Sequence, residues 1–239
     1  MHPKVLLLAA AATTLSLTAH AQSAPISGAP LIVASAPFSA QEWTTITFNR
    51  SDGTAAKILR RVDVARNSAG STRREFRILA NSSTAAQPTG SLYADIHDVP
   101  NNLAVHLVPA ASTATVNPLR KSAKPYIFPG SVPVGAVVAA PAQTLGFSSI
   151  AGFTASGSRQ TLLFPKGTKS DSQEVTQTTD TWYSSDLKSV LLTETTDSLN
   201  NSTVTALTQI DQSEPDPTLF TIPANYTTTV TGKSAQSPE

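Results

Sequence analysis

The chain has 239 residues, which is enough for one substantial domain or two small ones. Its 17 Lys and Arg against 16 Asp and Glu give a formal net charge of +1, so no global field favours nucleic acid or an anionic membrane as a partner. The absence of cysteine excludes disulfides, a thiolate nucleophile and cysteine metal sites.

Residues 1–21 are typical of a secretory signal peptide. Lys4 precedes an apolar run over residues 5–17, and residues 19–21 read Ala-His-Ala, with small residues where signal peptidase cleaves. We therefore expect export to the periplasm or the medium, with Gln22 as the first mature residue. The apolar run is shorter than the roughly 20 residues of a spanning helix, and no later run approaches that length, so we expect no transmembrane segment.

We expect a single β domain over residues 41–226. Residues 22–40, rich in Ala, Ser and Pro, predict a disordered leader, and the polar residues 227–239 predict a disordered tail. Five prolines within residues 117–142 exclude a helix or a central strand there, so this stretch is expected to be a long connection that interrupts the domain.

Ten stretches of the expected domain have the composition and alternation of β-strands. They are residues 43–48, 57–66, 72–79, 91–98, 103–109, 112–116, 152–164, 174–183, 188–196 and 203–212. No amphipathic helix of three turns is present after the signal peptide. The pattern predicts a mainly β fold of about 9–11 strands in antiparallel hairpins, with few or no helices.

The hairpin of residues 57–66 and 72–79 carries a cluster of six arginines: Arg60, Arg61, Arg66, Arg73, Arg74 and Arg77. If its turn is centred on Ser68, Arg61 opposes Glu75 and Asp63 opposes Arg73, which neutralises part of the charge. The cluster is either a solvated hairpin of ion pairs or a docking surface for phosphate or carboxylate groups of an envelope glycan or lipid headgroup.

Two of these arginines conflict with a purely solvated hairpin. Arg60 and Arg74 share strand parity with Val62 and Phe76, so they point toward a core or a cavity. A buried guanidinium without a partner is costly, so both side chains either extend to an edge or line a groove that admits water or an anion.

The next hairpin contains the only histidines that remain after signal cleavage, His97 and His106. If residues 99–102 form its turn, Asp95 opposes His106, and Asp95, His97 and His106 share one face. These residues are either a weak metal or acid-base site, or ordinary exposed strand residues.

If the register of the hairpin of residues 174–183 and 188–196 places Trp182 near Val190, Asp180 and Glu194 share a face. Paired carboxylates serve glycoside hydrolysis, but charges at the open end of a hairpin also discourage edge pairing. After the last expected strand, Phe220 and Tyr226 lie in a proline-rich segment that we expect to pack across the sheet as a latch.

Several motifs resemble those of a family of uncharacterised exported bacterial proteins. They run from Arg66-x-x-x-Gly70-x-x-Arg73-Arg74-Glu75 through Trp182-Tyr-Ser-x-Asp-Leu187 to Glu214-Pro-Asp-Pro-x-Leu-Phe220-x-Ile-Pro-Ala-x-Tyr226. More remotely, the layout is similar to the half-barrel superfamily of outer-membrane lipoprotein carriers and envelope-stress regulators. This resemblance implies a curved antiparallel sheet or half-barrel whose concave face holds a lipid-like chain.

No nucleophile elbow, HExxH helix, phosphate-binding loop or dinucleotide motif is present in the sequence, and we expect no cofactor and no metal. We expect a non-enzymatic binding or carrier-like protein of the cell envelope with a lipid-like or protein ligand. Its tentative ligand-binding residues are Arg60, Arg74, Phe76 and Trp182. The alternatives are an exported hydrolase of envelope or extracellular polymers that uses Asp180 and Glu194, and a purely structural or adhesive role. The sequence does not indicate an oligomeric state.

Overall fold

The computed structural model describes residues 33–50, 52–81, 83, 87–119 and 132–231. The expected signal peptide lies outside these residues, as do most of the expected leader and tail and the centre of the proline-rich connection. The described residues form one sheet of 12 strands in the order β12-β6-β5-β4-β3-β2-β1-β11-β10-β9-β8-β7. Neighbouring strands are antiparallel except β12 and β6, which are parallel.

The strands are β1 (Phe38–Asn49), β2 (Ala55–Arg66), β3 (Thr72–Leu79), β4 (Pro88–Asp98), β5 (Leu103–Val108), β6 (Thr113–Pro118), β7 (Val137–Ile150), β8 (Phe153–Phe164), β9 (Val175–Ser184), β10 (Ser189–Asp197), β11 (Ser202–Asp211) and β12 (Thr227–Val230). Two single-turn 3-10 helices, η1 (Pro109–Ala111) and η2 (Pro217–Phe220), complete the regular elements of the described chain. None of its helices is long and apolar enough to cross a membrane.

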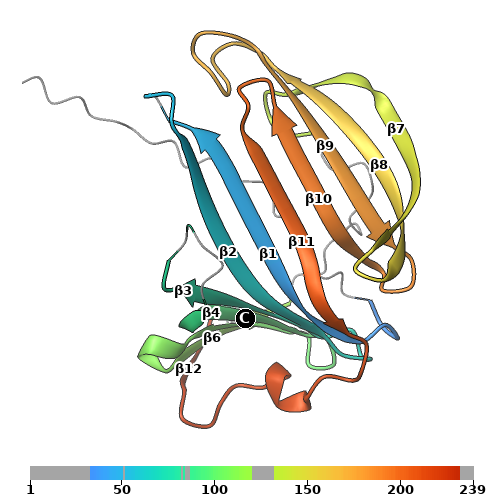
Figure 1. Cartoon of the computed structure of the whole chain (residues 1–239). Coiled ribbons are helices and arrows are strands. Elements are labelled where there is room, and N and C mark those ends of the chain that lie inside the picture. Colours follow the sequence, from blue (N-terminus) through green and yellow to red (C-terminus); the bar gives the residue numbers. More distant parts are fainter. Residues whose placement is uncertain (1–32, 51, 82, 84–86, 120–131, 232–239) are drawn as a thin grey trace, which may run out of the picture.

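The sheet is curved and open, and it confirms the expected mainly β, antiparallel fold (Figure 1). Figure 1 shows β3, β4, β6 and β12 turning away from the plane of β1, β2 and β11, while the segment after β11 crosses beside them. The strand number is 12 rather than 9–11 because β7 and β12, the two edge strands, were not expected.

Both unexpected strands lie in stretches assigned to irregular structure. β7 begins inside the expected proline-rich connection and contains Pro141, which an edge strand tolerates because one of its sides needs no ladder donors. Its register shifts between Ala140 and Gln143, around that proline. β12 lies in the expected tail, and β1 starts at Phe38, inside the expected leader.

The register of the hairpin that carries the histidines was predicted correctly, and the register of the hairpin that carries the arginine cluster was not. In β4 and β5, Asp95 opposes His106, as predicted. In β2 and β3 the predicted register is wrong, because Asp63 opposes Glu75. The turn closes between Asn67 and Ser71, where Asn67 N donates to Ser71 O at 3.0 Å, so it is centred one residue later than expected.

Directly opposed residues of neighbouring strands lie on the same face of a sheet, which defines two faces here. Glu42, Val62, Phe76 and Tyr93 oppose one another in turn across β1 to β4. We call their side, which also carries Arg74, the Arg74 face. The opposite side, which carries Asp63, Glu75 and Ile96, is called the latch face.

Each face has its own apolar core. On the Arg74 face, Phe38, Val62 and Val64 belong to a buried cluster that also includes Leu207. On the latch face, a second cluster contains Ile96, Leu107, Val116 and Phe220. Leu219, Ile222 and Tyr226 pack against this second cluster, so the segment after β11 covers part of the sheet, as the sequence predicted for the latch.

Candidate functional site

A buried ion pair crosses the Arg74 face. Arg74 from β3 reaches over β2 to Glu42 of β1, and Arg74 Nη2 lies 2.6 Å from Glu42 Oε1. The two side chains are only 13% and 3% exposed. Arg74 therefore lies on the core side of the sheet, where strand parity placed it, and a carboxylate from two strands away balances its charge.

Part of this pair's hydrogen-bonding capacity is unused. Among the described residues, Arg74 Nε, Arg74 Nη1 and Glu42 Oε2 are buried and have no hydrogen-bond partner. Burial raises the pKa of Glu42, and the charge and hydrogen bond of Arg74 oppose that rise only in part. Buried polar atoms without partners are costly, so a polar group that reached these atoms would remove part of that cost.

An aromatic group borders the ion pair. The rings of Phe76 and Tyr93 are stacked with centroids 4.3 Å apart, and the Arg74 guanidinium lies 5.5 Å from the Phe76 centroid. Burial and the charge of Asp95 raise the pKa of Tyr93, while the charges of Arg74 and Arg60 lower it. Arg60, Arg74 and Phe76 thus gather around Tyr93, and Arg60 is exposed. Sequence reasoning identified these three residues and missed Tyr93, whose even spacing from Asp95 and His97 was the available signal.

The predicted contact between Asp95 and His106 is present. His106 Nδ1 lies 2.7 Å from Asp95 Oδ1, and both side chains are about half exposed. His97 shares their face through its pairing with Ala104, and burial lowers its pKa, with the Asp95 charge acting in the opposite direction. No group of three or more His, Cys, Asp or Glu that could hold a metal ion occurs in the described part of the chain.

Trp182 lies on β9, several strands from Arg60 and Arg74, but it packs against the same buried cluster as Phe76. It opposes Leu192 of β10 beside a register shift, and not Val190 as expected. The six-membered ring of Trp182 lies over Gly157 of β8, where a Cβ would be 2.6 Å from ring atom Cζ3. The glycine leaves room for the ring against the backbone.

The two carboxylates of the hydrolase alternative lie opposite each other, but one of them is held in an ion pair with an arginine. Asp180 directly opposes Glu194 across β9 and β10. Arg159 of β8 donates from Nε and Nη2 to the two oxygens of Asp180, each at 2.6 Å, and this interaction raises the pKa of Arg159. Glu194 is exposed. The pair forms an ion-paired surface row rather than an acid and a base facing a cleft.

Arg66 was counted with the arginine cluster, but in the structure its side chain holds two segments of the chain together. It is fully buried, its Nε donates to Ala36 O at 2.8 Å, and its Nη1 and Nη2 donate to Lys188 O and Leu187 O. Burial lowers its pKa to about 10, so it remains charged at neutral pH. It ties the start of β1 to the turn between β9 and β10.

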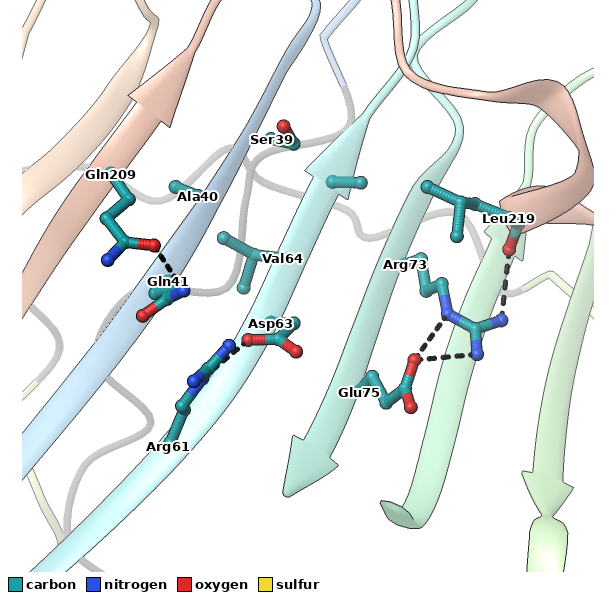
Figure 2. Close-up of a pocket in the computed structure, with 11 residues that line it drawn as sticks. Ser39, Ala40, Gln41, Arg61, Asp63, Val64, Arg73, Glu75, Gln209 and Leu219 are labelled. Carbon is teal, nitrogen blue, oxygen red and sulfur yellow. Dashed lines mark hydrogen bonds and ion pairs between the residues drawn. The ribbon is translucent and has the colours of Figure 1, made fainter. Parts of the chain in front are cut away.

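A pocket of about 360 Å³ lies on the latch face, between the sheet and Leu219 (Figure 2). Its charged lining pairs along single strands, with Arg61 Nε 2.8 Å from Asp63 Oδ1 and Arg73 Nη2 2.9 Å from Glu75 Oε2. Burial acts to raise the pKa of Glu75, but hydrogen bonds and charges from Arg73 and Arg77 outweigh it, so the pKa is lowered. The spacing of two residues within Arg61-x-Asp63 and Arg73-x-Glu75 was the sequence signal for these pairs.

The latch is attached at this pocket. Arg73 Nη1 donates to Leu219 O at 3.0 Å, which connects β3 to η2. Nearby, Ser68 N donates to Glu214 Oε1 at 3.0 Å, and the hydrogen bonds from Ser68 lower the pKa of Glu214. The charge network of the hairpin therefore also holds the carboxy-terminal segment.

Comparison with known proteins gives matches among solved structures only. No family model matches the chain, and no curated protein does. The lipoprotein LppX from Mycobacterium tuberculosis matches at 12% identity and a TM-score of 0.33, over 74% of this chain and 88% of that one. A LolA superfamily protein from Nitrosomonas europaea matches at 14% identity and a TM-score of 0.30, over 77% and 90%. A DUF1329 family protein from Desulfovibrio piger matches at 10% identity and a TM-score of 0.26, over 80% and 91%.

The chain is thus remotely similar to LolA superfamily structures, which is the remote resemblance expected from its layout. We take no ligand or activity from these matches, because their identities and TM-scores are low.

Proposed function

We propose that this protein is a non-enzymatic binding protein of the bacterial cell envelope, exported by its signal peptide, and that its Arg74 face holds a lipid-like ligand with an anionic group. The observation that carries the proposal is the state of Arg74. Two of its buried nitrogens, Nε and Nη1, have no hydrogen-bond partner among the described residues, and they lie beside the stacked rings of Phe76 and Tyr93. A charged donor next to an apolar surface matches the two ends of an amphipathic molecule.

The two arginines have different parts in this proposal. Arg60 is exposed and attracts an anionic group from solution without a large desolvation cost. The two nitrogens of Arg74 that face no protein acceptor are buried, so the side chains that cover them must move before they can donate to the ligand. Glu42 keeps the charge of Arg74 balanced whether or not a ligand is present, so the ion pair itself need not separate.

The apolar part of the ligand would lie over β3 and β4. Ile78, on the Arg74 face beyond Phe76, is 44% exposed and extends the apolar surface. On the other side of the arginines the face is lined by hydroxyl groups, because Arg60 opposes Thr44 and Thr44 Oγ1 lies 3.0 Å from Thr205 Oγ1. An alkyl chain gains more free energy on the Ile78 side, where it displaces water from apolar surface.

The alternative of an exported hydrolase has less support. Its acid and base would be Asp180 and Glu194, and Arg159 occupies both oxygens of Asp180. Both oxygens of Asp180 are therefore engaged by a protein side chain and not free to face a substrate.

The proposal is tested by calorimetric titration of the mature protein with lysophosphatidic acid and with its uncharged analogue, monoacylglycerol, below their micelle concentrations. We expect the anionic lipid to bind at least about tenfold more tightly. Arg60→Gln should remove most of that difference. Lys57→Gln is the matched control, because Lys57 is also exposed on β2 but lies on the opposite face. Equal affinity for the two lipids, or equal losses in both variants, would contradict the proposal.

A further inference from the structure

The pocket on the latch face is separate from the proposed lipid site, since the sheet lies between them. Figure 2 shows Gln41 and Gln209 on one side of the pocket, and Arg73, Glu75 and Leu219 on the other. The pocket is bounded by β1, β2, β3 and β11 together with the latch, and its volume of about 360 Å³ suits a small ligand.

The lining is polar, and its charged groups are planar. Two guanidinium groups, from Arg61 and Arg73, face two carboxylates, from Asp63 and Glu75, and Arg77 from outside the lining also pairs with both carboxylates. A guanidinium has five N–H donors and a carboxylate about four lone-pair sites, so each group keeps some beyond its ion pairs. Such groups match adjacent sugar hydroxyls, which can donate and accept hydrogen bonds at once. An ion or an alkyl chain matches this lining less well, because half the charges repel any ion and an alkyl chain satisfies none of the polar atoms.

The backbone is strained where it presents one of these groups. Gln209 has φ of +49°, in the left-handed region that non-glycine residues rarely adopt. It lies at the irregularity where the register of β1 and β11 shifts between Ser39 and Gln41, and such bulges redirect side chains. Its amide lines the pocket and accepts a hydrogen bond from Gln41 Nε2. A glycine would fit this backbone without strain, so the glutamine side chain is present here at a cost in backbone strain.

An aromatic ring adjoins the pocket. Trp43 Nε1 donates to Gln41 Oε1 at 3.2 Å, and the Arg61 guanidinium lies 5.7 Å from the centroid of the Trp43 ring. Two residues of the pocket lining therefore contact this tryptophan. Because the chain has only two tryptophans, and Trp182 lies three strands away, Trp43 fluorescence can report binding here.

We propose that this pocket binds one neutral sugar unit of a glycan chain. The polar groups bind the hydroxyls of the sugar, and their ion pairs hold them in place before the ligand arrives. An extended peptide is a weaker match, because β1, β2, β3 and β11 are each paired on both sides and offer no free edge to which a peptide strand could add. The inference does not depend on the lipid site.

The test uses the full mature chain with Trp182→Phe, so that Trp43 is the only emitter. The probes are the β-1,4-linked tetramers of N-acetylglucosamine and of glucose, each titrated to about 10 mM. We expect at least one tetramer to change the Trp43 fluorescence in a saturable manner. Gln209→Gly should weaken that binding at least about tenfold, while thermal unfolding stays unchanged or moves to higher temperature because the strain is relieved.

Two further variants separate a local effect from loss of folding. Asp63→Asn keeps the size of a pocket side chain and should also weaken binding, whereas Asp186→Asn, in the exposed turn after β9, should have no effect. The inference is overturned if neither tetramer binds, if Gln209→Gly binds as tightly as its parent, or if tetra-alanine binds more tightly than both sugars. Arg60→Gln should leave sugar binding unchanged, so failure of one site is distinguishable from failure of the other.

Discussion

Replacing Arg74 alone should cost far more stability than replacing the whole ion pair. In Arg74→Met, the carboxylate of Glu42, which is 3% exposed in the parent, loses the charge of Arg74. Removing one member of a buried pair costs about 3–5 kcal/mol, because the remaining charge is uncompensated. Replacing both with apolar residues of similar size is often neutral or stabilising. We therefore expect Arg74→Met to lower the free energy of unfolding by about 3–5 kcal/mol at pH 7.5 and Glu42→Leu/Arg74→Met to recover most of it.

The loss should also depend on pH in a defined direction. The pKa of Glu42 is already raised in the folded protein, so ionisation of Glu42 opposes folding as pH rises through the folded-state pKa. Without Arg74 the two contributions that lower this pKa vanish, and the pKa rises further. The deficit of Arg74→Met should then be smaller at pH 4.5, where the folded variant can hold Glu42 protonated, than at pH 7.5.

Urea unfolding of the parent, Arg74→Met and the double variant at both pH values measures these differences. The reasoning is refuted if Arg74→Met costs less than about 1 kcal/mol at pH 7.5, or if the double variant is no more stable than the single one. Recovery in the double variant would mean that stability does not require the charged pair.

Other changes probe the rest of the structure. Arg66→Lys should lower the free energy of unfolding by about 2–4 kcal/mol, measured by urea unfolding, because one ammonium cannot replace guanidinium donation to three carbonyls of two segments; an unchanged midpoint would contradict this. Gly157→Ala should cost about 1–3 kcal/mol and alter the emission of Trp182, since the added methyl overlaps its ring, and a silent substitution would show that the ring is free to move. Glu75 has a lowered pKa, so its stabilising contribution is present at neutral pH and lost as pH falls through that pKa. Glu75→Gln should therefore unfold with less dependence on pH between 3 and 5 than the parent, and parallel pH profiles would exclude this contribution.

The register of a hairpin could be predicted where its turn was short and could be recognised from its residues. With a two-residue turn at Pro100 and Asn101, numbering pairs Asp95 with His106, and the structure has this pairing. The turn between β2 and β3 holds Ser68, Ala69 and Gly70, and placing its centre one residue too early moved every predicted pair. The arginines still pair with acids, but along each strand instead of across it.

The features that were missed depend on neighbours distant in sequence. β7 and β12 are edges, paired on one side and largely exposed, so neither needs the apolar alternation by which strands are recognised. The partner of Asp180 comes from β8, and that of Arg74 from β1, two strands away. The latch-face pocket requires four strands and the carboxy-terminal segment at once. Parity on one strand indicated the face of Arg60, Arg74 and Phe76, but it could not place Trp182 relative to them.

Native mass spectrometry of the protein purified gently from its own envelope fraction tests the central claim most directly. We predict a reproducible bound mass in the lipid range that is lost on denaturation. The fraction of protein that carries this mass should be unchanged in Lys57→Gln and reduced in Arg60→Gln. A ligand-free mass for the parent protein, or an equal bound fraction in the two variants, would contradict binding of a lipid-like molecule at the Arg74 face.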